Sequence, residues 1–131
     1  MTDQQEQHTV EAEFEITDFD ENVYDEPSDG PKMTRVTIRK RYQGVIDGTG
    51  VAEVLTAQGG AGGGYVASER IEGTIDGRQG TFVIQHFGLA DGDEQSSDGR
   101  IVPGSGTGGL AGISGQAMER RFQVLTLTYT L

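Results

Sequence analysis

Three polar side chains stand on strand faces that are otherwise apolar, and these are His86, Glu53 and Glu69. His86 shares a face with Phe82 and Ile84 in the most apolar stretch of the chain. An imidazole beside a carboxylate can act as an acid–base couple or as a hydrogen-bond anchor for the polar end of a ligand. A buried carboxylate is costly unless it is paired, so we expect Glu53 or Glu69 within hydrogen-bond reach of His86, or one water away. Such a pair would hold His86 protonated to higher pH than an exposed histidine.

The two glutamates are expected to face inward because of their neighbours. Glu53 lies between Val51 and Leu55, and Glu69 shares a face with Tyr65, Ala67 and Ile71. Each could also be an outward polar group or half of a structural pair, and their candidate partners are Arg70, Arg78, Tyr129 and His86. The expected ligand-binding residues around them are Tyr65, Arg70, Phe82, Ile84 and Tyr129.

Alternation of apolar and polar residues predicts strands throughout the chain. Glycine-containing turns separate them, with Asp47-Gly48 and Asp76-Gly77 as tight hairpin turns and 59–64 as a flexible hairpin loop. We expect polar loops at 18–32 and 89–98 and a glycine-rich corner at 104–115. The expected strands cover residues 10–17, 33–46, 49–57, 65–75, 80–88, 99–103 and 121–131.

Seven or eight short strands without helical periodicity indicate an all-β protein. We predict a closed antiparallel eight-stranded barrel, calycin-like in size, because closure removes exposed sheet edges. It would form a single domain over residues 9–131, with residues 1–8 disordered. A barrel of eight strands encloses room for side chains or one small ligand.

The charge distribution disfavours several classes of partner. The formal net charge of the 131 residues is −11, and the first 30 residues hold 11 acidic residues and no Lys or Arg. Nucleic acids and acidic membrane surfaces are disfavoured, because binding them needs clustered basic residues. The chain has no cysteine, and no apolar run approaches the length of a membrane span. We expect a cytoplasmic protein. Its acid excess and scarce lysine suit either a high-salt cytoplasm or an ordinary acidic protein from a GC-rich genome.

The glycine segment 104–115 imitates a nucleotide-binding fingerprint. Gly104, Gly106 and Gly109 match G-x-G-x-x-G, but the fingerprint must open a helix, and Gly112 and Gly115 would break one. We therefore expect no bound nucleotide and no cofactor. Tight backbone packing at a barrel corner would make valine at position 106 or 109 strongly destabilising.

Metal sites are disfavoured as well. Asp91, Asp93 and Asp98 resemble a calcium loop, but its closing glutamate position holds Val102. His8 lies in the expected disordered segment, which leaves one ordered histidine.

Two charged stripes are expected to face each other on the outside of the barrel. Cross-strand ion pairs would link three glutamates to three arginines on the neighbouring strand, namely Glu11, Glu13 and Glu15 with Arg35, Arg39 and Arg41.

Four stretches carry a resemblance to a known family. They are Tyr24-Asp25-Glu26 with residues 30–35 (GPKMTR), residues 48–53 (GTGVAE), residues 80–86 (GTFVIQH), and residues 102–108 (VPGSGTG) with 110–112 (LAG). From about residue 10 onward the chain resembles a prokaryotic family of small domains of unknown function with the allene oxide cyclase-like barrel fold, in which Glu69-Arg70 also fits. The resemblance implies an eight-stranded barrel with a central cavity, often in a homo-oligomer, and does not imply allene oxide cyclase activity. The stretch GQAMERRFQ before the last strand is shorter than the family pattern, so one barrel mouth should be more open.

Three functions remain open from the sequence. The first is binding of a small apolar or amphipathic molecule in the barrel lumen. The second is a cofactor-free isomerase or cyclase acting on an apolar substrate, with His86 and a carboxylate giving acid–base help. The third is a structural or oligomeric scaffold with a packed interior.

Overall fold

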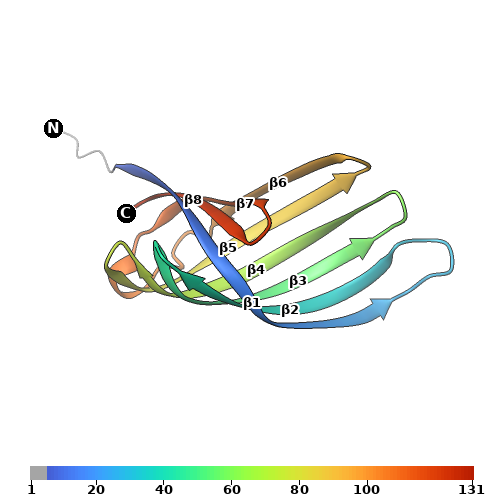
Figure 1. Cartoon of the computed structure of the whole chain (residues 1–131), viewed down its shortest axis with the longest axis horizontal. Coiled ribbons are helices and arrows are strands. Elements are labelled where there is room, and N and C mark those ends of the chain that lie inside the picture. The colour runs from blue at the N-terminus through green and yellow to red at the C-terminus, as the bar shows by residue number, and fades with distance from the viewer. Residues whose placement is uncertain (1–5) are drawn as a thin grey trace.

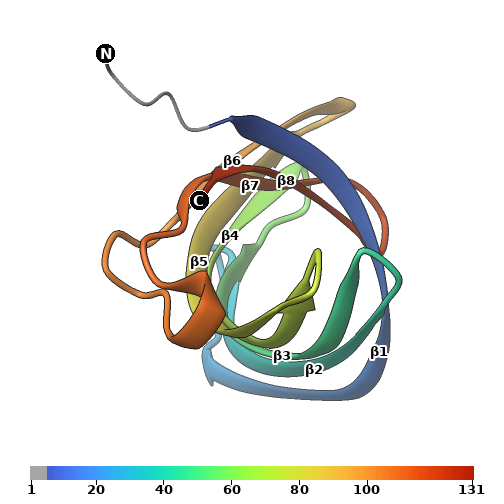
Figure 2. The same cartoon turned by 90° about the vertical axis from the view of Figure 1, so that its left-hand side faces the viewer.

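The fold is a single antiparallel sheet that closes in a ring. The computed structural model describes residues 6–131, and each strand pairs with the next while β8 pairs with β1 (Figure 2). The predictions of an all-β protein and of eight antiparallel strands are therefore confirmed. The strands are β1 (Gln7–Asp25), β2 (Lys32–Gln43), β3 (Ile46–Gln58), β4 (Gly62–Ile75), β5 (Arg78–Asp91), β6 (Glu94–Ile101), β7 (Ser114–Arg121) and β8 (Val124–Thr130).

The ring is complete over only part of its length. The first part of β1, from Gln7 to Glu13, pairs with β8, whereas the remainder of β1 pairs with β2 alone. Because β7 and β8 are short, the hairpins of β1 to β6 continue past them as an open trough (Figure 1). One end of the molecule is thus a closed ring and the other is open along one side.

The closed end holds the main hydrophobic core. A short 3₁₀ turn (Gly108–Leu110) lies in the segment between β6 and β7, and Leu110 and Ile113 from this segment are buried with inward side chains of the strands. A smaller apolar cluster lies toward the open end and contains Val36, Ala52, Val54 and Ala67. The buried polar residues Lys40, Glu69 and His86 lie between these two clusters along the strands.

Two hairpin turns test the turn predictions. Asp76 and Gly77 both have positive φ, 51° and 79°, as a tight primed turn requires, so this prediction is confirmed. The prediction for Asp47-Gly48 is wrong, because the turn lies at Gly44 and Val45 and both predicted residues belong to β3. Gly48 is needed there for close strand packing, since a Cβ would overlap the Glu72 carbonyl oxygen.

Several expected loops and strand limits are wrong for one physical reason. Residues 18–25 continue β1, and 94–98 begin β6 after a short turn at Gly92, where loops were expected. Strand β7 begins at Ser114, within the expected glycine corner 104–115, and continues past it. Phe122 and Gln123, expected in the last strand, form the turn between β7 and β8. Many of these residues are exposed on both faces, so no apolar alternation marks them. Their backbone pairing with the neighbouring strand holds them in the sheet.

The N-terminal prediction is corrected in part. Residues 1–5 of the expected disordered segment lie outside the described residues, while Gln7 and His8 belong to β1 and pair with Thr130 and Tyr129. No helix among the described residues is long and apolar enough to cross a membrane.

The expected charged stripes meet only in part. Glu15 lies opposite Arg41 in the strand register, but Glu11 forms its ion pair with Arg121 of β7, at 2.7 Å. These side chains are exposed, so such pairs contribute about 0–1 kcal/mol each.

Candidate functional site

A buried ion-pair cluster lies at the inner end of the open trough. Lys40 of β2 donates hydrogen bonds from Nζ to Glu69 of β4, at 2.8 Å from Oε1, and to Glu119 of β7, at 2.9 Å from Oε1. The Tyr42 hydroxyl donates to the other oxygen of Glu69 at 2.6 Å. Lys40 is 5% exposed and Glu69 is fully buried, so water contributes little to either charge. Three strands that are distant in sequence therefore supply one polar network.

The cluster keeps Lys40 as a cation and Tyr42 as a neutral donor. Burial on its own lowers the pKa of Lys40, but the charges of Glu69 and Glu119 outweigh it and the pKa is raised. Burial, followed by the charge of Glu69, raises the pKa of Tyr42 well above its ordinary value. Lys40 is therefore a cation at neutral pH, held by hydrogen bonds to Glu69 and Glu119.

His86 lies beside this network with one ring nitrogen unused. It is 7% exposed, and its Nδ1 is 3.1 Å from the Tyr65 hydroxyl, whose ring meets the imidazole edge-on. Its Nε2 is buried and has no hydrogen-bond partner among the described residues. Buried polar atoms are rarely left in this state, so each such case asks for an explanation.

The protonation of His86 differs from the expectation. Burial lowers its pKa, and this effect outweighs the opposing charge of Glu119, while Lys40 lowers the pKa further. The predicted upward shift of the pKa is therefore wrong, because burial disfavours the charged imidazole more than the nearby carboxylates favour it. Burial and the charge of Glu119 also raise the pKa of Tyr65 to about 12. At neutral pH the pair is a neutral imidazole and a neutral phenol.

The expected proximity of His86 to a glutamate is found for Glu69. A ring nitrogen of His86 and carboxylate oxygens of Glu69 and Glu119 lie within 4.8 Å of one another, although no direct hydrogen bond joins the imidazole to either acid. Two carboxylates and an imidazole are a common ligand set for divalent cations. Here Lys40 already hydrogen-bonds both carboxylates, so a metal ion could bind all three only by displacing the ammonium group.

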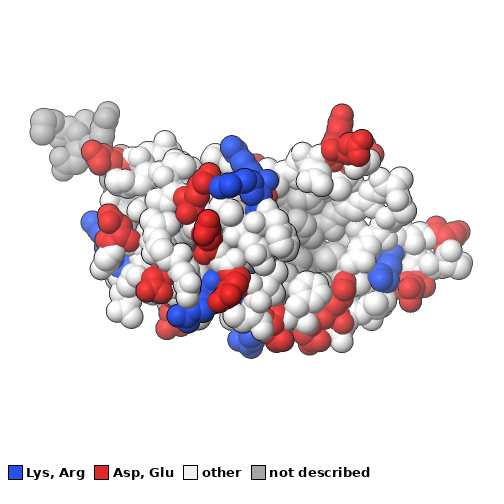
Figure 3. Space-filling model, viewed as in Figure 1, with Lys and Arg blue, Asp and Glu red and all other residues white. Residues whose placement is uncertain are grey.

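A pocket of about 340 Å³ lies against this cluster, within the open part of the sheet. Its walls are mainly apolar, and its opening includes Phe19 and Phe122, which are 56% and 84% exposed. The surface is hollowed beside the β7–β8 hairpin in the space-filling view (Figure 3). The lining residues are Phe14, Ile16, Phe19, Glu21, Val36, Ile38, Lys40, Ala52, Val54, Thr56, Gln58, Tyr65, Ala67, His86, Glu119, Phe122 and Gln123.

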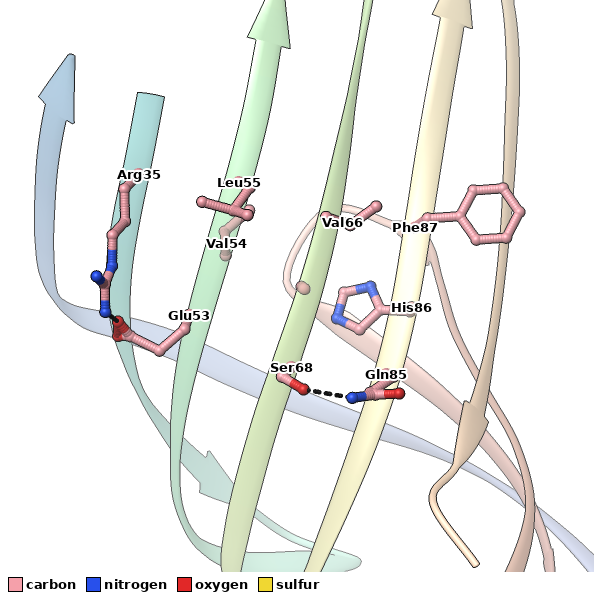
Figure 4. Close-up of a pocket in the computed structure, with 10 residues that line it drawn as sticks. Arg35, Glu53, Val54, Leu55, Val66, Ser68, Gln85, His86 and Phe87 are labelled. Carbon is pink, nitrogen blue, oxygen red and sulfur yellow. Dashed lines mark hydrogen bonds and ion pairs between the residues drawn. The ribbon is translucent and has the colours of Figure 1, made fainter. Parts of the chain in front are cut away.

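The structure places Glu53 on the outer face of the sheet, so its expected position beside His86 is wrong. Glu53 accepts a hydrogen bond from the Thr37 hydroxyl at 2.8 Å. It accepts another from Arg35 Nη2 at 3.1 Å (Figure 4). The hydrogen bond from Thr37, aided by Arg35, lowers its pKa. On β3 the inward side chains are those of Ala52 and Val54, and alternation turns Glu53 outward.

The other predicted site residues fall into three groups. Tyr65 lines the pocket and contacts His86. Phe82, Ile84 and Tyr129 belong to the packed core at the closed end and do not line the pocket. Arg70 is exposed on the outer face of β4, so its expected place in the lumen is wrong.

Sequence reasoning missed Lys40 and Glu119. The sequence could have indicated Lys40, because it stands between Ile38 and Tyr42 on the face opposite the arginine stripe. Glu119 carried no such signal, since its strand was not predicted and the strand mixes small and charged residues.

Comparison with known proteins places the whole site within one family. The family described as "Protein of unknown function (DUF3224)" matches residues 10–129. The chain belongs to the DUF3224 family. A crystal structure of a DUF3224 protein of unknown function from Shewanella oneidensis MR-1 is similar, with 28% sequence identity and a TM-score of 0.81. The likeness covers 95% of this chain and 96% of that one. No curated protein matches the chain. The predicted membership in a family of unknown function is thus confirmed, and the role of this DUF3224 chain must be argued from its own residues.

Proposed function

We propose that this DUF3224 protein binds a small apolar or amphipathic molecule in the pocket bounded by the Lys40–Glu69–Glu119 cluster. The observation that carries the proposal is the buried Nε2 of His86, which has no hydrogen-bond partner in the described part of the chain and belongs to a residue that lines a mainly apolar pocket. A ligand's polar atom, reached after a small side-chain shift, would satisfy that nitrogen and remove the cost of leaving it unpaired.

The size and walls of the pocket support this proposal. About 340 Å³ lies in the range of small-molecule sites, which are mostly apolar with a few placed polar groups. Phe19 and Phe122 are large apolar side chains left exposed at its opening. Covering them with the apolar part of a ligand would be favourable, at about 25 cal/mol per Å² of apolar surface removed from water.

Native mass spectrometry of the purified protein tests for a retained ligand. Ala67 lines the pocket, so Ala67→Leu should fill part of it and remove the ligand's added mass. Val66 is 55% exposed on the outer face of the same strand, and Val66→Leu is the matched control that should keep the ligand. Equal ligand occupancy in the two variants contradicts the proposal.

A second candidate function is a cofactor-free isomerase or cyclase, favoured by the neutral His86–Tyr65 pair beside Glu119. An isomerisation by proton transfer moves a proton from one substrate atom to another, so one group that accepts it and returns it is sufficient. Incubation with a small-molecule extract should then yield a product of unchanged mass and altered chromatographic retention. The change should disappear in His86→Ala, and its persistence there contradicts this function.

The finer features of the fold and assembly are also proposals. We infer that the ring is an allene oxide cyclase-like barrel, which the sequential order of eight antiparallel strands supports.

We propose a homo-oligomer, for which Leu55, Val66 and Phe87 supply adjacent apolar side chains on the outer face. His86 and Phe87 leave β5 in opposite directions (Figure 4). Sedimentation velocity with Val66→Asp tests the oligomer. The cytoplasmic location stays a prediction from composition.

A further inference from the structure

The charged groups that line the pocket are unbalanced toward acid. Its lining includes two carboxylates, Glu21 and Glu119, and one cation, Lys40. Lys40 is shared between Glu119 and the fully buried Glu69, so its single positive charge faces two negative ones within hydrogen-bond distance. His86 adds no charge at neutral pH because burial lowers its pKa. A ligand therefore meets a net negative potential at the inner end of the pocket.

Both carboxylates that line the pocket keep an oxygen that can accept a further hydrogen bond. The residues that the structure describes give Glu119 one side-chain hydrogen bond, from Lys40 to Oε1, which leaves Oε2 open. Within residues 6–131, Glu21 receives side-chain hydrogen bonds from Thr34 and Gln58 on Oε2, which leaves its Oε1 open. A carboxylate has about four acceptor positions, so both side chains can take further donors.

Lys40, by contrast, has little left to offer an anion. Two of its three N–H groups are used on carboxylates, and Nζ lies 4.3 Å from the centre of the Phe14 ring. An ammonium group over an aromatic face gains a further attraction. A ligand carboxylate would have to compete with Glu69 and Glu119 for this cation and would meet their repulsion.

We propose that the ligand of this pocket is an amphipathic amine, whose ammonium group donates hydrogen bonds to Glu119 while its apolar part covers Phe19 and Phe122. This proposal rests on the proposed binding function and names the chemical class that the site takes. When Nδ1–H of His86 donates to the Tyr65 oxygen, the buried Nε2 is an acceptor, and it has no partner among residues 6–131. This open acceptor is the independent sign that the cluster meets a donor of a ligand there. Glu119 recognises the ammonium charge of the ligand, and the apolar walls of the pocket contact its hydrocarbon part.

Calorimetric titration with three probes of equal chain length tests the assignment. The probes are octylammonium, 1-octanol and octanoate, each titrated into the full chain at pH 7. Because a hydrogen bond to a charged group is stronger than a neutral one, octylammonium should bind at least about tenfold more tightly than octanoate, which corresponds to about 1.4 kcal/mol. The neutral alcohol, which both donates and accepts, should fall between them.

Two variants distinguish an effect of the Glu119 carboxylate from an effect of the overall charge of the protein. Glu119→Gln keeps the shape and removes the charge, and it should lower the preference for octylammonium over octanoate by about tenfold. Glu53→Gln removes a carboxylate from the outer face of the sheet and should leave the preference unchanged. If Glu119→Gln does not fold, Glu21→Gln at the exposed end of the pocket should lower the preference in the same direction.

The outcomes distinguish this inference from the proposed function. Octanoate binding as tightly as octylammonium, or an ammonium preference that Glu119→Gln and Glu21→Gln leave intact, overturns the amine assignment while binding itself stands. Binding of none of the three probes, with no retained ligand in native mass spectrometry, overturns the proposed function and the amine assignment together.

Discussion

Replacing Lys40 by methionine tests whether the buried cluster is held by its central cation. Methionine keeps the length and apolar stem of the side chain and removes the ammonium group. Glu69, which is fully buried, would keep only the Tyr42 hydroxyl as a donor. Glu119 would lose the one side-chain hydrogen bond it receives from the described residues. The variant therefore leaves an uncompensated carboxylate in the interior of the sheet.

The expected cost follows from burial. Removing one partner of a buried ion pair costs about 3–5 kcal/mol, because the remaining charge has neither water nor partner. The matched control is Arg35→Met, which breaks the ion pair with Glu53 on the outer face, where the side chains are 65% and 43% exposed. An exposed pair of this kind contributes about 0–1 kcal/mol. The structure thus predicts a difference of at least about 2 kcal/mol between two chemically similar losses.

Urea unfolding at pH 7, followed by circular dichroism, measures both costs. The double variant Lys40→Met/Glu69→Gln should recover more than half of the loss, because glutamine carries no charge and can still accept from Tyr42. The double variant also keeps the test valid if Lys40→Met alone fails to fold. A cost for Lys40→Met no larger than that for Arg35→Met, or a double variant less stable than the single one, would refute the reasoning.

Two further predictions concern pH and packing. The folded-state pKa of His86 lies below the ordinary value of 6.5, so its contribution to stability is present above that pH and is lost as the pH falls through the folded pKa. His86→Gln should therefore flatten the fall in urea midpoint between pH 7 and pH 5, and an unchanged slope would contradict the assigned burial. Gly106→Val should cost about 1–3 kcal/mol, because a Cβ would clash with the Leu110 carbonyl oxygen, whereas at Gly109 the nearest atom is 3.0 Å away and the cost should be smaller. Gly60, whose added Cβ would meet nothing within 4 Å, is the control, and thermal unfolding that ranks Gly60→Val with Gly106→Val would contradict this account.

The sequence alone determined the class of fold and part of the interior. Alternation on β2 placed the stripe of Arg35, Arg39 and Arg41 outside, which correctly leaves Val36 and Tyr42 inside. The same reasoning placed His86 inside with Phe82 and Ile84. In these strands one face is clearly apolar, and a period of two then leaves only one orientation that buries it.

Strand β3 shows where alternation fails. Both of its faces carry apolar residues, with Val51 and Leu55 on one and Ala52 and Val54 on the other. Sequence pattern favoured the larger side chains and so placed Glu53 inside. The interior instead takes Ala52 and Val54. Space on this face is tight, since a Cβ added at neighbouring Gly50 would overlap the Glu69 carboxylate. Which face is buried was decided by the space left by the facing strands.

The candidate site itself was decided by closure of the ring. Lys40 and Glu119 are 79 positions apart in the chain, yet their side chains lie 2.9 Å apart. No local pattern can indicate this pairing, since it depends on where closure of the ring places β7 relative to β2. The sequence could mark single polar residues as costly to bury. Only the tertiary structure showed that Lys40 neutralises Glu69, because the partners of a buried charge are chosen by three-dimensional proximity and by the exclusion of water.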